Sequence, residues 1–216
     1  PRDTPDNSRL LDGVPGIKIK DITYAYPESD KEVFTHFSHD FRPGSRTAII
    51  GPTGVGKSTL IRLLLALLTP KKGSITLYGN EEVAVSASTR CNLVYVPQGN
   101  SLFSGTIREN LRMVCPNVTE DSLKEVLEVA CADFVWELPQ GLDTEIGENG
   151  YGLSEGQAQR LAVARALLLP GSVWIFDEVT AALDAKTAHQ LVTNLLERGK
   201  EKIILFVTHD AALEGQ

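Results

Sequence analysis

The sequence predicts an α/β fold built around a largely parallel sheet. Short, strongly apolar segments lie at 47–50, 173–176 and 203–207, and such runs are typical of strands buried on both faces. Segments with helical periodicity separate them, and this alternation favours a parallel sheet covered by helices. The chain has 216 residues, of which 42% are hydrophobic. That is enough for a core without disulfides or metals, and it excludes a disordered chain.

Charge and cysteine content exclude some classes of protein. The 21 Lys and Arg residues against 28 Asp and Glu residues leave a formal charge of −7, which argues against a nucleic-acid partner. Cys91, Cys115 and Cys131 are widely spaced, so they suggest no zinc site or disulfide framework and favour a reducing compartment. No stretch approaches the roughly 18 apolar residues of a membrane span. The chain starts without Met, and we interpret it as a piece of a longer polypeptide.

The N-terminal region predicts a linker followed by a bulged strand. Residues 1–14 are polar with two early prolines, which is typical of a linker. Ile17 and Ile19 then share one phase of an alternating pattern, whereas Ile22 and Tyr24 share the other. Because one extra residue moves the following side chains to the opposite face, this change of phase predicts a β-bulge near Asp21.

The rest of the chain alternates between extended and helical patterns. Extended segments are expected at 34–41, 74–78 and 92–96. Helices are expected at 57–68, 154–168 and 184–198. The last of these helices would have Asp184 as its N-cap and Gly199 just beyond its end. Residues 99–168 read as mostly helical. Within them one helix is expected to carry an apolar stripe of Leu123, Val126, Leu127, Ala130, Cys131 and Phe134.

A glycine-rich turn between a strand and a helix predicts a nucleotide-binding loop. Residues 51–58 fit the pattern G-x-x-x-x-G-K-[ST] in the strand–loop–helix context that it requires. Glycines let backbone N–H groups face a polyphosphate, and the helix start adds positive potential. Lys57 can neutralise the terminal phosphates, and the Ser58 hydroxyl can bind Mg²⁺. The candidate binding residues are Gly51, Pro52, Thr53, Gly54, Val55, Gly56, Lys57, Ser58 and Thr59.

Two carboxylates follow the apolar strand 173–176. Parallel sheets bind ligands at the carboxyl ends of their strands, so Asp177 is expected to hold Mg²⁺ through water. Adjacent residues on a strand point to opposite faces, so Glu178 is expected to polarise the attacking water instead. In isolation such a pair is commonly a solvated strand end.

A second candidate anion site lies at residues 153–157, which read L-S-E-G-Q. Ser154 is a good N-cap for the helix that follows. A serine and free amides at a helix start can bind an anion, although alone this segment would be only a capped helix.

Together these motifs resemble the nucleotide-binding domain of ATP-binding-cassette (ABC) transporters. The resemblance covers about 17–209, and the motifs follow one another in the order that is usual for the family. The phosphate loop is at 51–58, the Q-loop glutamine is Gln98, and the signature sequence is at 153–157. The end of the Walker B strand is at 177–178, the D-loop is at 182–184, and the switch histidine is His209. It implies a RecA-like P-loop NTPase core with an N-terminal antiparallel β subdomain and an inserted α-helical subdomain. The implied division is a linker at 1–14, a core at 15–98 and 167–216, and the helical subdomain at 99–166.

The resemblance also implies a role for individual residues. Two such domains would close head to tail, so that Ser154, Gly156 and Gln157 contact the ATP held by the partner domain. Tyr26 would stack on adenine, and His209 would contact the γ-phosphate. The implied catalytic residues are Glu178, His209, Lys57 and Gln98. The implied Mg²⁺ ligands are Ser58, Gln98 and Asp177.

Further similarities point to the exporter branch of the family. Segments 102–111 and 144–148, the latter including Glu148, resemble exporter elements. They favour a half-transporter whose transmembrane domain precedes Pro1, acting at the cytoplasmic face of the inner or plasma membrane. Three features depart from the family pattern. Glu155 stands where glycine is usual, and Asp210 stands where exporters often have a basic residue. The chain also stops at Gln216, before the strands and helices with which the family usually ends. The Glu155 carboxylate would either weaken closure by repelling phosphate or turn outward.

The sequence therefore predicts an ATP- and Mg²⁺-dependent motor domain of an exporter, paired with an identical or related domain. Three alternatives stay open: a soluble ABC ATPase without a membrane partner, an importer ATPase subunit, and a regulatory module that binds nucleotide without turnover. The joint presence of Lys57, Asp177, Glu178 and His209 speaks against the last.

Overall fold

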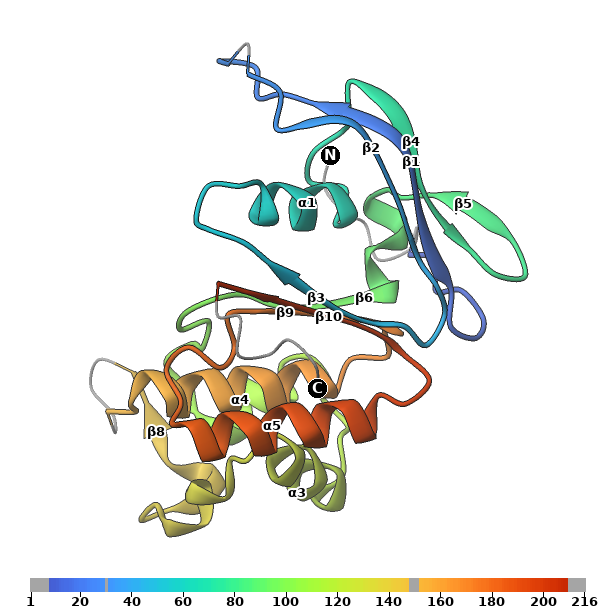
Figure 1. The fold of residues 1–216 in the computed structure, drawn as a ribbon. Coiled ribbons are helices and arrows are strands. Elements are labelled where there is room, and N and C mark those ends of the chain that lie inside the picture. Colours follow the sequence, from blue (N-terminus) through green and yellow to red (C-terminus); the bar gives the residue numbers. More distant parts are fainter. Residues whose placement is uncertain (1–7, 30, 148–151, 210–216) are drawn as a thin grey trace. The chain divides into compact units, whose positions relative to one another are not determined.

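The structure, a computed structural model, describes residues 8–29, 31–147 and 152–209, which form two units (Figure 1). Of the described residues, the first unit takes those within 1–94, 171–176 and 201–216, and the second takes those within 95–170 and 177–200. Residues 1–7 of the expected linker, together with Glu148, Asp210 and Gln216, lie outside the described residues. The predicted boundaries of core and helical subdomain stay a prediction.

An antiparallel sheet forms part of the first unit. Its strands, in the order β2-β1-β4-β5, are β1 (Gly16–Tyr24), β2 (Phe34–Phe41), β4 (Lys72–Tyr78) and β5 (Glu82–Ala84). The predicted bulge is confirmed: the register of β1 on β2 shifts between Ile19 and Ile22, and Asp21 has a φ of 51°. Because of this shift Ile19 and Ile22 are both buried, although they are in opposite phases of the sequence.

A second sheet carries the short apolar strands. Its order is β3-β10-β9-β6, from β3 (Arg46–Ile50), β6 (Leu93–Val96), β9 (Val173–Asp177) and β10 (Ile203–Thr208). β10 and β3 pair in parallel, with Thr208 opposite Ile50. Residues 173–176 of β9 and all of β10 are buried, as their lack of polar side chains predicts. The predicted α/β class is confirmed.

Helix α1 (Lys57–Leu64) is shorter than the expected 57–68. Ala66 takes a left-handed conformation with a φ of 51°. Its N–H donates to the Leu63 carbonyl at 3.0 Å, and the Leu67 N–H donates to the Arg62 carbonyl at 2.8 Å. This is the Schellman arrangement, which ends a helix and is usually built on glycine. The apolar run therefore continues past the end of the helix, which leaves Leu67 57% exposed.

The second unit is mostly helical, as predicted. Its helices are α2 (Ile107–Arg112), α3 (Glu120–Val129), α4 (Glu155–Leu167) and α5 (Ala185–Arg198), with short 3₁₀ turns η3 (Asp133–Glu137) and η4 (Gly141–Asp143). The turn η2 (Ala87–Asn92) belongs to the first unit. Helix α3 packs against both α4 and α5 (Figure 1). A side-chain oxygen caps the start of each of the four helices, from Thr106, Thr119, Ser154 and Asp184 respectively. The predicted caps Ser154 and Asp184 are confirmed.

The apolar stripe beginning at Leu123 does not lie on one continuous helix. Helix α3 ends at Val129, and Cys131 is left-handed with a φ of 54°. The Cys131 N–H donates to the Glu128 carbonyl and the Ala132 N–H to the Leu127 carbonyl, which is again a Schellman ending. The placement of Cys131 on a helical face was therefore wrong, because the residue terminates the helix.

A two-stranded ribbon was not predicted. Strands β7 (Gly105–Thr106) and β8 (Glu145–Ile146) pair antiparallel, with Gly105 opposite Ile146. They bring together the two segments that resemble exporter elements. Among the described residues no helix is long and apolar enough to cross a membrane.

Candidate nucleotide-binding site

The predicted phosphate loop joins β3 to α1 and faces solvent. Its residues 52–55 are exposed. Gly54 and Gly56 have φ values of 85° and 112°, which side chains rarely adopt. A Cβ on Gly56 would also lie 2.9 Å from Val33 Cγ1. The loop conformation therefore depends on glycine at both positions.

The start of α1 is suited to an anion. Gly56 is its N-cap and supplies no side-chain hydrogen bond, and the first turn contains no acidic residue. The first N–H groups of α1 therefore have no side-chain cap, unlike those of α2–α5. Lys57 reaches back over the loop, where its Nζ donates to the carbonyl of Gly51 and, at 3.3 Å, to that of Pro52. A cation and uncapped N–H groups thus meet at one loop, an arrangement that suits a polyphosphate.

Two further predicted residues belong to the same unit as this loop. The Tyr26 hydroxyl lies 3.0 Å from Thr59 Oγ1, and Arg62 donates to it at 3.4 Å. These bonds hold the half-buried Tyr26 beside the first turns of α1. His209 follows Thr208, which pairs with Ile50, the residue before Gly51. His209 and the phosphate loop therefore begin side by side at the carboxyl ends of neighbouring parallel strands.

The acidic pair belongs to the second unit. Asp177 is the last residue of β9, and its Oδ2 accepts a hydrogen bond from the Tyr95 hydroxyl at 3.0 Å. Glu178 has left the strand: its φ is 53°, and its carbonyl accepts from the Ala181 N–H at 3.2 Å. The alternation argument for Glu178 was therefore wrong, because a turn rather than the pleat of a strand sets its direction. Such a left-handed non-glycine residue is uncommon and is often found at functional sites.

The turn after Glu178 ends at Asp184, which caps α5. Asp184 accepts from the Thr187 N–H at 3.0 Å and from the Thr187 hydroxyl at 2.7 Å. These hydrogen bonds hold the pKa of the Asp184 carboxyl below its usual value. Because they favour the ionised form, the carboxylate stays a cap at neutral pH.

The signature segment forms the start of α4. Ser154 Oγ accepts from the Gln157 N–H at 3.2 Å, and Gln157 Oε1 accepts from the Ser154 N–H at 2.9 Å, a capping box. Ser154 and Glu155 are exposed, and Gly156 is buried. The side-chain oxygen of Gln157 already accepts a hydrogen bond from Ser154 of the same chain. The predicted contact between Gln157 and a partner's nucleotide would therefore have to form while this hydrogen bond is kept.

Gly156 packs against the D-loop segment of the same unit. A Cβ on Gly156 would lie 2.6 Å from the Ala182 carbonyl oxygen and 2.9 Å from Leu183 Cδ2. This contact gives the glycine a packing role that sequence reasoning missed. No sequence signal could have revealed it, because it depends on how two segments about 26 positions apart approach each other.

Gln98 lies on an exposed bend after Pro97. The carbonyl of Pro97 accepts a hydrogen bond at 3.1 Å from Nε2 of Gln159, which is only 3% exposed. The signature helix α4 is thereby tied to the backbone beside Gln98. Gln159 and Tyr95 both contact the predicted site, and the sequence assigned neither of them a role there.

The residues present fit a hard cation such as Mg²⁺. The implied donors are the Ser58 hydroxyl, the Gln98 amide and the Asp177 carboxylate, all oxygen ligands of the kind Mg²⁺ prefers. Within the described part of the chain no three His, Cys, Asp or Glu residues gather into a metal cluster.

The predicted residues fall into two sets, one in each unit. The first unit holds Tyr26, the phosphate loop 51–59 and His209, and the second holds Gln98, 154–157, Asp177 and Glu178. Within the first set, Tyr26 lies beside the first turns of α1, and His209 follows the strand that pairs with the one leading into the phosphate loop. Within the second set, the signature segment 154–157 contacts the turn that follows Glu178 through Gly156.

Comparisons with known proteins show the family of the chain. A family model described as ABC transporter matches residues 34–181. An uncharacterized ABC transporter ATP-binding protein of Sinorhizobium fredii is 36% identical over 202 residues, covering 93% of this chain and 34% of that protein. The Beta-(1-->2)glucan export ATP-binding/permease protein NdvA of Brucella melitensis is 36% identical over 211 residues, covering 96% of this chain and 35% of that protein.

A solved structure of a bacterial Atm1-family ABC exporter with ATP bound is similar at a TM-score of 0.85 and 33% identity, covering 97% of this chain and 37% of that one. The match confirms the predicted P-loop NTPase fold. The chain spans about a third of the length of the curated relatives that it matches. Since the family model and these relatives cover most of its residues, the chain belongs to the ABC transporter family.

Proposed function

We propose that this chain is the ATP-binding and ATP-hydrolysing motor domain of an ABC exporter, which drives transport through ATP-dependent dimerisation. The observation that carries the proposal is the exposed loop before α1, with its two left-handed glycines, uncapped helix start and overlying Lys57. Relatives named as export ATP-binding/permease proteins support the exporter branch. ATP-binding domains of this family are generally ATPases.

The chain's own residues would bind and position ATP. The loop N–H groups and Lys57 would hold the β- and γ-phosphates, and the Tyr26 ring would stack on adenine. Glu178 would accept a proton from the attacking water, while His209 would orient it against the γ-phosphate. When bound, Mg²⁺ supplies charge neutralisation of the phosphates, with Ser58, Asp177 and Gln98 as its protein-side ligands. Catalysis would then depend on positioning and electrostatics rather than on a covalent intermediate.

The second half of each site would come from another domain. Ser154 is exposed at the capped start of α4, where its hydroxyl and the helix N-terminus can meet a phosphate bound to a partner domain. We therefore propose a head-to-tail pair of identical or related domains, with each ATP between one phosphate loop and the other signature helix.

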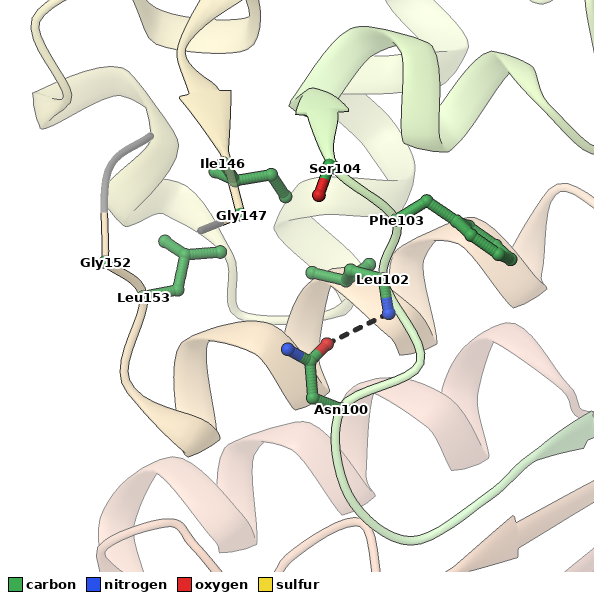
Figure 2. A pocket seen from close by; sticks show the side chains of 8 residues that line it. All are labelled: Asn100, Leu102, Phe103, Ser104, Ile146, Gly147, Gly152 and Leu153. Carbon is green, nitrogen blue, oxygen red and sulfur yellow. Dashed lines mark hydrogen bonds between the residues drawn. The ribbon is translucent and has the colours of Figure 1, made fainter. Parts of the chain in front are cut away.

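A transmembrane domain of the same polypeptide is the other proposed partner, placing this domain at the cytoplasmic face of the inner or plasma membrane. A pocket of about 370 Å³ beside the β7–β8 ribbon suits such a contact. Figure 2 shows Leu102, Ile146 and Leu153 converging on the pocket, while the 55%-exposed Phe103 points away from it. The buried Asn110 fixes Phe103 through hydrogen bonds to its N–H and its carbonyl, both 2.8 Å long. These bonds fix the backbone of Phe103, and its exposed ring is the apolar side chain that we propose contacts the transmembrane domain.

Replacing Ser154 with Ala tests the proposed function. The change removes a helix cap, which costs about 1 kcal/mol, and it also removes the hydroxyl proposed for the partner's phosphate. We expect Mg²⁺-dependent phosphate release by the intact transporter to fall roughly 10²-fold, as for other lost transition-state donors. Thr119→Ala is the matched control, because Thr119 caps α3 by the same bond to the Ser122 N–H at 3.2 Å.

Thr119→Ala should lose similar stability and keep normal turnover. If the two variants released phosphate at the same rate, Ser154 would be only a cap and the shared site would be refuted. If the unmodified transporter released no phosphate, the ATPase assignment itself would be wrong.

A further inference from the structure

We infer that Tyr95 is a positioning residue for Asp177, the carboxylate proposed to hold Mg²⁺. The inference rests on the proposed ATPase function and adds a residue that no motif contains. Tyr95 lies on β6, which neighbours β9 in the sheet, and its hydroxyl donates to Asp177 Oδ2 at 3.0 Å. Both residues belong to the second unit.

The strand alternation of β6 directs Tyr95 to this position. Val94 and Val96 are each 1% exposed, whereas Tyr95 between them is half-buried. Because successive side chains on a strand point to opposite faces, the tyrosine lies on the face opposite the two valines. Its ring extends across to the neighbouring strand and ends at the carboxylate of Asp177.

The hydrogen bond from Tyr95 limits how the carboxylate of Asp177 can turn. Rotation about χ2 of an aspartate is broad rather than confined to sharp wells. A hydrogen bond to one oxygen removes this freedom and directs the other oxygen along a defined line. Ligating carboxylates are commonly held in this way by outer partners, and loss of such a partner typically weakens metal binding 10- to 100-fold. Tyr95 would therefore set the direction of Oδ1 toward Mg²⁺ or its water shell.

The chain contains a matched control for this bond. Tyr78 on β4 donates to Asp40 Oδ1 at 2.7 Å, so Tyr78→Phe removes a similar hydrogen bond outside the proposed site. Tyr95→Phe likewise removes a single hydroxyl and keeps the ring. Comparing the two separates the effect of losing any tyrosine–aspartate bond from the effect of losing this one.

The test measures binding rather than hydrolysis. The dissociation constant of a non-hydrolysable ATP analogue is determined for the intact transporter in excess Mg²⁺ and again in EDTA. The ratio of the two constants reports the contribution of the metal. We expect Tyr95→Phe to lower this ratio roughly tenfold and to leave the constant in EDTA unchanged. Tyr78→Phe should change neither, and Tyr95→Phe should have no further effect when Asp177 is already Asn.

Three outcomes would overturn the inference: an unchanged ratio in Tyr95→Phe, an equal loss of binding with and without metal, or an additive effect in the double variant. If Asp177→Asn lowers the ratio but Tyr95→Phe does not, only the role of Tyr95 is wrong. If the unmodified transporter fails to bind the analogue, the proposed function fails and the inference fails with it.

Discussion

Replacing Glu178 with Gln is expected to lower the rate of ATP hydrolysis by roughly 10²–10⁴, the usual contribution of a general base, while ATP binding persists. Glutamine keeps the size of the side chain and one acceptor oxygen but cannot take a proton from water. The backbone of Glu178 is held by the turn in which its carbonyl accepts from the Ala181 N–H at 3.2 Å. The substitution should therefore change chemistry without changing the conformation of the turn.

Phosphate release and nucleotide affinity, both measured on the intact transporter, check this expectation. Glu197→Gln, an exposed position on α5, serves as the control for losing a carboxylate elsewhere and should hydrolyse ATP normally. A normal rate in Glu178→Gln would show that the base is another group, and equal loss of binding and rate would show a structural defect.

Replacing Gly156 with Ala should damage both stability and turnover. The added methyl would lie 2.6 Å from the Ala182 carbonyl oxygen, closer than Cβ atoms approach backbone oxygens. Either α4 or the segment 180–183 must therefore move. Helix α4 begins beside Ser154, and the segment 180–183 follows Glu178 in the same turn. Overpacking of this kind typically costs 1–3 kcal/mol of unfolding free energy. Displacement of Ser154 or Glu178 should lower phosphate release by at least the roughly 10²-fold expected for a lost donor.

The control is Gly79→Ala, since a Cβ on Gly79 would make only an ordinary van der Waals contact, 3.8 Å from Pro15 Cα. Gly79 belongs to the first unit, outside α4 and the turn after Glu178, and its replacement should be neutral in denaturant unfolding and in phosphate release. The packing role of Gly156 would be disproved by wild-type stability in Gly156→Ala. Reduced turnover at wild-type stability would instead point to a contact with the partner's nucleotide.

Features encoded locally were predictable from the sequence. The bulge at Asp21 follows from a change in the phase of the apolar residues, and the caps Ser154 and Asp184 follow from side-chain chemistry at a helix start. The phosphate loop has a glycine pattern with one dominant physical meaning. In each case the residues that determine the conformation are adjacent in the chain.

Features that depend on non-local contacts or on unusual residues could not be predicted. Helices α1 and α3 end at left-handed Ala66 and Cys131, where the glycine that usually marks such an ending is absent. The direction of Glu178 depends on the end of β9, which sequence periodicity locates only to within a few residues. The partners of Tyr95 and Gly156 depend on strand order and on packing between distant segments.

The central claim is that two domains share each ATP, and cysteine cross-linking tests it directly. Val55 is 54% exposed on the phosphate loop and Glu155 is exposed beside Ser154, so both accept cysteine. In the intact transporter carrying Glu178→Gln, Val55→Cys and Glu155→Cys, we expect ATP and Mg²⁺ to induce a disulfide between two different domains. Variants with either new cysteine alone, which retain Cys91, Cys115 and Cys131, should form none. Absence of the cross-link in all nucleotide conditions, or a cross-link confined within one domain, would contradict the shared site.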